Sequence, residues 1–138
     1  MVTSDDPPSS TLLAVRTATR SLMVTARSLS EADVRRPSLL PGWSRAHVLS
    51  HLAGNAEGGA RLLEGVASGV PGWEYVDLGS RAADIEEGAL LPIEMLVLRL
   101  ETTAERFDDA CAAVPSDHWS TPVTWTTGHR NAASEVVA

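Results

Sequence analysis

The sequence has 138 residues, 43% of them hydrophobic, and a formal net charge of −7, as expected of one folded domain rather than a disordered chain. All 11 basic residues are arginines and they are dispersed, so the clustered positive charge of a nucleic-acid surface is missing. We therefore expect a single domain over residues 1–138 with no nucleic-acid partner.

No segment of the sequence has the pattern of a signal peptide or of a membrane-spanning helix. The N-terminus is polar and acidic, whereas a signal peptide begins with basic residues followed by an apolar run. The apolar stretches are far shorter than the roughly 20 residues that cross a bilayer. Cys111 is the single cysteine, which excludes an internal disulfide. We therefore expect a cytoplasmic protein without membrane contacts.

The first predicted element is a helix that begins at Ser9 or Ser10, after two prolines, and runs to Leu29. Its apolar residues recur at alternating spacings of three and four, which is typical of an amphipathic helix with one buried stripe. Residues 30–43 hold two prolines and a glycine and predict a connection that Trp43 closes. The stripe consists of Leu12, Val15, Thr19, Leu22, Ala26 and Leu29.

The second predicted helix begins at Ser44 and runs to about Ser68. We place Leu52 at the centre of its apolar stripe. Gly58 and Gly59 each cost about 1 kcal/mol relative to alanine inside a helix. We therefore expect another helix or a ligand to approach closely there. The stripe consists of Val48, Leu49, Leu52, Ala56, Gly59, Leu63 and Val66.

Two more helices are predicted in the following part of the chain. Residues 79–88 favour a short helix, and Pro92 suits the first turn of a third long helix. The apolar stripe of that helix contains Cys111, which predicts a core thiol. The helix is expected to stop at Pro115.

The C-terminal part is rich in Trp, Thr and Pro and predicts an extended, loop-like segment over residues 117–130. His118 and His129 lie in this segment and are expected to be exposed. Residues 132–138 look like the start of another helix. Since no pair of strands is convincing, we predict an all-α helical bundle.

The second helix carries the residues that could perform chemistry. On a helical wheel centred on Leu52, Asn55 lies about 60° to one side, His51 about 100° and His47 about 140°. His51 and Asn55 therefore flank the buried stripe, where a bundle helix can face a cleft. One interpretation is that His51 ligates a divalent metal while Asn55 hydrogen-bonds a ligand beside it. The other is that His51 bonds to a neighbouring carbonyl. The pair His47 and His51 is a weaker metal candidate, because a zinc site needs three or four ligands.

The run Leu40-Pro-Gly-Trp-Ser-Arg-Ala-His-Val-Leu-Ser-His51-Leu-Ala resembles the N-terminal domain of mycothiol-dependent maleylpyruvate isomerases. These are actinobacterial proteins with a DinB-like four-helix bundle. The similarity continues through Arg81-Ala-Ala-Asp-Ile-Glu-Glu-Gly-Ala and through Pro122-Val-Thr-Trp. It covers the chain from about residue 10 to the last residue.

The resemblance implies a chemistry for His51. In that family the matching histidine is one of three protein ligands of a zinc ion. The metal lowers the pKa of the mycothiol thiol, and the thiolate adds to the cis double bond of maleylpyruvate. Rotation about the resulting single bond and departure of the thiolate then give the trans isomer. The implied cofactors are thus a divalent metal and mycothiol, and the implied substrate is a small carboxylate. The resemblance also allows a related activity, in which the same site transfers a thiol to another acceptor molecule.

Arg81 is the second residue with an implied role. Together with Asp84 and Glu86 it matches the family pattern Arg-x-x-Asp-Ile-Glu, near where a guanidinium could hold a substrate carboxylate. The alternative is a charge cluster at a helix start that interacts with the helix dipole. The resemblance therefore implies Asn55 and Arg81 as the catalytic residues and His51 as the metal ligand.

The sequence departs from the family at the other two metal ligands. These form a Glu-x-x-x-His motif on the fourth helix, and no such motif follows His51. We therefore expect an incomplete DinB-like up-down bundle of three long helices with an extended C-terminal segment. Whether the chain is an enzyme stays open. The alternative is a non-catalytic module that binds a partner or forms a homodimer through its uncovered apolar faces.

Overall fold

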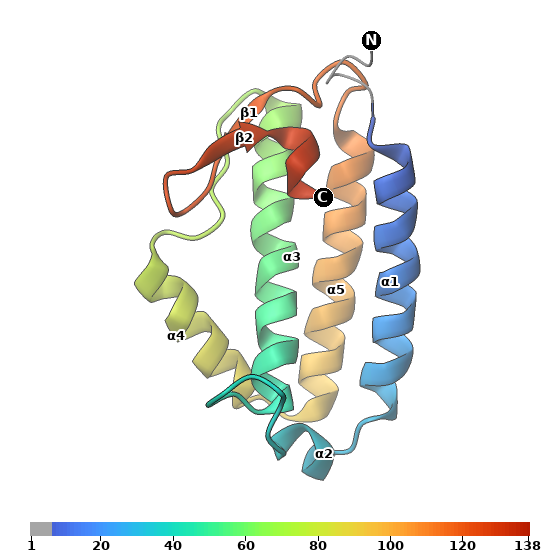
Figure 1. Ribbon diagram of the computed structural model, residues 1–138, viewed down its shortest axis with the longest axis vertical. Coiled ribbons are helices and arrows are strands. Elements are labelled where there is room, and N and C mark those ends of the chain that lie inside the picture. Colours follow the sequence, from blue (N-terminus) through green and yellow to red (C-terminus); the bar gives the residue numbers. More distant parts are fainter. Residues whose placement is uncertain (1–6) are drawn as a thin grey trace.

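The computed structural model describes residues 7–138. Three long helices lie side by side, with α5 (Ile93–Ala113) between α3 (Arg45–Ser68) and α1 (Ser9–Ser28), as Figure 1 shows. α3 packs most extensively against α5. α4 (Leu78–Ala89) crosses the lower part of α3 and diverges from it, and α2 (Glu31–Arg35) closes the lower end. The predicted long helices and the short helix at 79–88 are confirmed.

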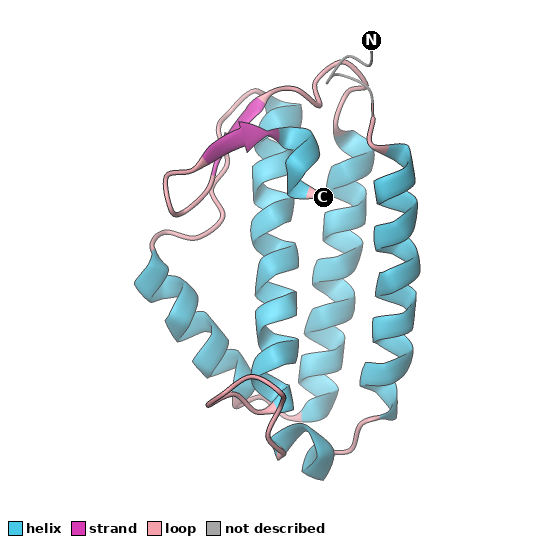
Figure 2. Ribbon diagram, in the orientation of Figure 1, coloured by secondary structure: helices cyan, strands magenta, loops and turns pink. Residues whose placement is uncertain are grey.

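The prediction that there are no strands is wrong. β1 (Pro122–Thr124) and β2 (Arg130–Ala132) form an antiparallel hairpin beside the upper end of α3 (Figure 2). The strands are too short to show a sequence alternation, so tertiary contacts define them. Val123 is buried between two exposed neighbours, and the Trp125 indole N–H donates to the Asn131 side chain at 2.8 Å. The start of a helix predicted at 132–138 is a single 3₁₀ turn, η1 (Ala133–Val136).

The buried side chains form two clusters, one at each end of the α3–α5 pair. The upper cluster contains the buried Cys111, as predicted, and burial raises the pKa of this thiol to about 12. It also contains Trp119, which is 1% exposed. The exposed positions predicted for His118 and His129 are confirmed as well. No helix among the described residues is long and apolar enough to cross a membrane.

The predicted α3 stripe is confirmed in part, because Leu49, Gly59, Leu63 and Val66 are buried. Leu52 and Ala56 are only partly buried, whereas the opposite side of α3 is covered through small residues. The segment 70–76, here called the strap, lies against Gly54, Gly58 and Gly65. A Cβ atom at Gly58 would lie 2.8 Å from Glu74 Cγ, and one at Gly65 would lie 2.3 Å from a strap amide nitrogen. The predicted close approach is thus confirmed at both glycines: the neighbour of Gly58 is the strap, and that of Gly59 is Phe107 of α5, 3.0 Å from the position of a Cβ atom.

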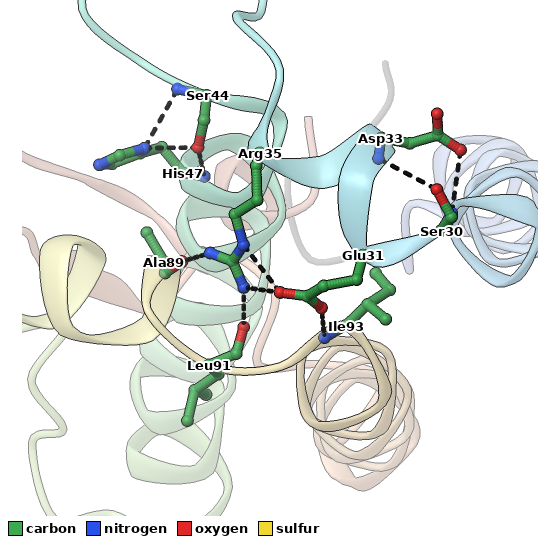
Figure 3. A network of polar contacts seen from close by, with 9 residues as sticks. All are labelled: Ser30, Glu31, Asp33, Arg35, Ser44, His47, Ala89, Leu91 and Ile93. Carbon is green, nitrogen blue, oxygen red and sulfur yellow. Dashed lines mark hydrogen bonds and ion pairs between the residues drawn. The ribbon is translucent and has the colours of Figure 1, made fainter.

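α2 was not predicted, and it holds the turn between α4 and α5 (Figure 3). The Arg35 guanidinium donates to the carbonyl of Ala89 and, at 2.6 Å, to that of Leu91. Glu31 accepts the backbone N–H of Ile93 at 2.7 Å, at the start of α5, and also pairs with Arg35. Since helix ends leave backbone groups without intrahelical partners, these two side chains satisfy both sides of the turn.

Replacement of Gly65 by alanine tests how closely the strap is seated. Alanine is better than glycine inside a helix by about 1 kcal/mol. Here the new methyl group would meet the strap backbone, so we expect Gly65→Ala to lower the free energy of unfolding by about 1–3 kcal/mol. Chemical denaturation measures the effect. Ala67→Gly, at an exposed position two residues later, serves as the control for intrinsic propensity. Stabilisation by Gly65→Ala would contradict the close contact.

The pH dependence of stability tests the Glu31 contact. The Ile93 N–H and then Arg35 lower the pKa of Glu31 below its ordinary value of 4.5. A carboxyl group whose pKa is lower in the folded state than in the unfolded state stabilises the fold at pH values above its unfolded-state pKa. This stabilisation is lost as the pH falls through the folded-state pKa. We therefore expect Glu31→Gln to be less stable than the wild type at pH 7, with a gap that narrows below about pH 4.5. Denaturation curves at several pH values measure this gap, and a gap independent of pH would contradict it.

Candidate functional site

The loop before α3 is a tight turn that begins the helix at a fixed point. Gly42 adopts a left-handed conformation with φ +77°, which favours glycine. The Trp43 N–H donates to the Leu40 carbonyl at 3.2 Å, and the Ser38 hydroxyl donates to the Trp43 carbonyl at 2.8 Å. The turn thus presents the Trp43 ring toward the first turns of α3 and places Ser44 as the N-cap.

His47 serves to cap α3. Its backbone N–H donates to the Ser44 hydroxyl, and its Nδ1 accepts the Ser44 N–H at 3.1 Å (Figure 3). Nε2 lies 3.0 Å from a carboxylate oxygen of Glu86 on α4. Because Nδ1 accepts the Ser44 N–H, Nε2 is the nitrogen that carries a proton and donates it to Glu86. Both ring nitrogens are therefore engaged, which makes His47 a poor metal ligand.

His51 lies one turn further along α3 and faces α4. Its Nδ1 is 3.3 Å from Nη2 of Arg81, which donates to it. Burial and, to a smaller extent, the Arg81 charge lower the pKa of His51 below its ordinary value of 6.5. The ring is therefore neutral at pH 7, which is the form in which histidine binds metals.

The Trp43 ring forms one wall beside both histidines. Its centroid is 6.2 Å from that of His47, nearly parallel, and 5.6 Å from that of His51, at a tilt of 49°. Trp43, which was predicted to close the connection before this helix, thus packs its ring on the two histidines of α3. Trp43, His51 and Arg81 come from the loop, α3 and α4 respectively, and we call them the His51 cluster.

Asn55 does not join this cluster. It is exposed and lines a groove of about 300 Å³ between α1, α3 and α5, to which the C-terminal residues also contribute. His51 is not among the residues that line this groove. Apart from Asn55 and Thr19 the lining side chains are apolar, among them Leu22, Leu52, Ala56, Phe107 and Val136.

The acidic residues near Arg81 separate into different roles. Glu86 accepts from His47, while Asp84 is exposed on α4. The N-cap of α4 is Asp77, which accepts the Ser80 N–H at 2.7 Å. The contact of Arg81 with His51 was not predicted, because the two residues are 30 positions apart and no local pattern pairs them.

The described residues do not form a complete metal centre. Among residues 7–138, no three His, Cys, Asp or Glu side chains are placed to hold one ion. A zinc site takes three protein ligands at least. His51 therefore fits one coordination position only.

The comparisons with known proteins agree with the predicted resemblance. The family description "Mycothiol maleylpyruvate isomerase N-terminal domain" matches residues 15–138. The crystal structure of a mycothiol-dependent maleylpyruvate isomerase superposes with a TM-score of 0.89 at 29% identity, over 99% of this chain and 57% of that chain. The crystal structure of a histidine-to-alanine mutant of this isomerase gives the same TM-score at 28% identity and the same coverage. No curated protein sequence matches the chain.

These matches confirm the DinB-like helical fold. The chain spans little more than half the length of the solved isomerase chains it matches, 57% in both cases.

The effect of Arg81 on His51 can be measured directly. A guanidinium beside the ring disfavours the imidazolium, so we expect Arg81→Met to raise the pKa of His51. The pKa should stay below 6.5, because burial is the larger cause and remains. NMR titration of the His51 ring protons measures the shift, with Arg20→Met, on α1, as the control. An unchanged or lower pKa in Arg81→Met would contradict the contact.

Proposed function

Because the chain belongs to the mycothiol maleylpyruvate isomerase N-terminal domain family, we propose that it forms the bundle of a mycothiol-dependent maleylpyruvate isomerase or of a related thiol S-transferase. The observation that carries this proposal is the His51 cluster, in which a neutral, half-buried imidazole lies 3.3 Å from a guanidinium. An imidazole and a guanidinium side by side suit a reaction of a thiol with a carboxylate substrate.

His51 is proposed as one ligand of a divalent metal ion, with zinc as the candidate. When bound there, such an ion would lower the pKa of a thiol so that it is held as a thiolate. The remaining ligands would have to come from groups outside the His51 cluster, since no three-residue set exists among residues 7–138.

Arg81 is proposed to bind the substrate carboxylate, and its contact with His51 supports this role. A neutral imidazole has one lone pair in the plane of the ring, and Nδ1 uses it to accept the Arg81 N–H. If His51 gives that lone pair to a metal, or moves its proton to Nδ1, the contact with Arg81 is lost. The released guanidinium then has both of its terminal nitrogens available for a bidentate carboxylate.

Asn55 is proposed to contact the thiol cofactor from the groove side of α3. It lies one turn beyond His51 and lines the groove, so a molecule reaching from the groove toward His51 would pass it. A side-chain amide offers both a donor and an acceptor, which suits the amide and hydroxyl groups of a small polar thiol.

The metal proposal predicts opposite effects at His51 and Arg81. We expect His51→Ala to reduce zinc binding by the purified protein, measured by competition with a chromogenic chelator. Arg81→Met should bind zinc more tightly, because the variant loses both a competitor for the lone pair and a nearby positive charge. His118→Ala, at an exposed histidine, is the matched control. Equal zinc affinity in His51→Ala and the wild type would remove His51 as a ligand.

The alternative proposal is a non-catalytic module that self-associates. It is supported by the missing three-residue ligand set and by the apolar groove, in which Leu52 is only partly buried. In this case the groove would be covered by a second copy of the chain, as a homodimer.

Activity and mass distinguish the two proposals. For the enzyme we expect mycothiol-dependent conversion of maleylpyruvate to its trans isomer, with a rate reduced at least about tenfold in Arg81→Met through loss of a charged hydrogen bond. For the module we expect no conversion and a dimer in sedimentation analysis that Leu52→Glu dissociates. A monomer without activity under zinc-loaded conditions would contradict both.

A further inference from the structure

A polar cavity separate from the His51 cluster lies between α3 and α4, next to the strap. It has a volume of about 250 Å³, and neither His51 nor Arg81 lines it. Side chains from four elements meet there. Those that matter are Glu57 and Arg61 of α3, Tyr75 of the strap, Asp84 of α4 and Arg99 of α5.

The Tyr75 hydroxyl is buried in the wall of this cavity without a hydrogen-bond partner among residues 7–138. The residue is 6% exposed, and its oxygen packs so closely on α3 that a Cβ atom at Gly54 would lie 2.8 Å from it. Burial also raises the pKa of Tyr75, so the group stays a protonated donor at neutral pH. A buried hydroxyl without a partner is unfavourable, and a ligand oxygen would satisfy it.

The Arg99 guanidinium also has unused hydrogen-bonding capacity. It reaches from α5 to α4, where Nη1 lies 2.8 Å from the position that a Cβ atom of Gly88 would take. Its nearest carboxylate, Glu57, is 3.9 Å away, and its side chain makes no hydrogen bond within residues 7–138. Arg61, by contrast, donates to the carbonyls of Trp73 and Glu74.

The charged side chains that line the cavity are balanced, with Arg61 and Arg99 against Glu57 and Asp84. Glu57 lies within 4 Å of three guanidinium groups, those of Arg61, Arg99 and Arg106, at 3.4, 3.9 and 3.6 Å. Arg106 is also paired with Glu64 at 2.8 Å. Arg99 is therefore the guanidinium with the most distant carboxylate of the three, since Arg61 lies closer to Glu57 and Arg106 is also paired with Glu64. An anionic ligand beside Arg99 would supply the close negative charge that this guanidinium lacks.

We infer that this cavity binds a small monocarboxylate, whose oxygens accept hydrogen bonds from the Tyr75 hydroxyl and the Arg99 guanidinium. A guanidinium and a hydroxyl are matched donors for the two oxygens of a carboxylate. The volume of about 250 Å³ is below the roughly 300–1,000 Å³ of pockets for drug-sized ligands, so the ligand is small. Asp84, the second acidic residue in the lining, disfavours a second negative charge on the ligand.

The test uses propionate as the probe and propionamide as its neutral analogue of the same shape. Titration of the ¹⁵N-labelled full chain, at constant ionic strength, is followed by backbone amide shifts. We expect saturable shifts in the strap and α4 with propionate and none with propionamide. Tyr75→Phe and Arg99→Gln should each weaken propionate binding at least about tenfold, as expected for loss of a hydrogen bond to a charged group.

Two controls separate this site from the proposed function. His51→Ala should bind propionate as the wild type does, and so should Arg20→Gln, which removes an exposed guanidinium on α1. Tyr75→Phe removes only an atom without a partner, so it should fold even if Arg99→Gln does not, and far-UV circular dichroism checks this. Unchanged affinity in Tyr75→Phe, equal shifts with propionamide, or loss of binding in His51→Ala would each overturn the inference.

Discussion

The turn between α4 and α5 is held by two oppositely charged side chains of α2. Arg35 donates to carbonyls at the end of α4, and Glu31 accepts the first amide of α5. Backbone groups at helix ends have no partner within the helix, so a helix pair joined by a short turn needs such groups from elsewhere. The orientation of α4 relative to this turn determines where Arg81 lies. The contact between Arg81 and His51 therefore depends on α2. The loop that ends at Ser44 leads from α2 directly into α3, so the same short helix also fixes the start of α3.

The close contacts on α3 depend on the absence of side chains. The strap lies on Gly54, Gly58 and Gly65, and Gly88 of α4 is in contact with Ser50 and Arg99. Each glycine weakens the helix that contains it, but each also removes the Cβ atom that would separate the packed segments. Both the His51 cluster and the cavity beneath the strap lie beside these contacts. The small residues of α3 and α4 therefore position functional side chains that belong to other elements.

Helix boundaries could be predicted from the sequence because they depend on local signals. The N-cap at Ser44 and the end of α3 at Gly69 are where the residue types suggest. The stripe of α3 could be predicted in part, because large apolar residues such as Leu49 and Leu63 are buried. The surface beneath the strap could not, because it consists of glycines, which carry no hydrophobic signal. The hairpin was missed because its strands are three residues long and depend on contacts such as that of Trp125 with Asn131. Resemblance singled out His51 and Arg81 separately, but only the fold brings them together.

The two halves of α1 differ in how they are held. Its buried residues, Met23 and Ala26, are both in the second half. The first half is tied to α5 by the ion pair of Arg16 with Asp108, in which both side chains are about half exposed, and exposed pairs of this kind add little stability. Segments with few buried contacts open locally at low cost, and their amide hydrogens exchange rapidly. Val15 and Thr19, in the less buried half of α1, line the groove opposite α3. The groove therefore lies between the most extensively packed helix pair of the bundle and the part of α1 with the fewest buried residues.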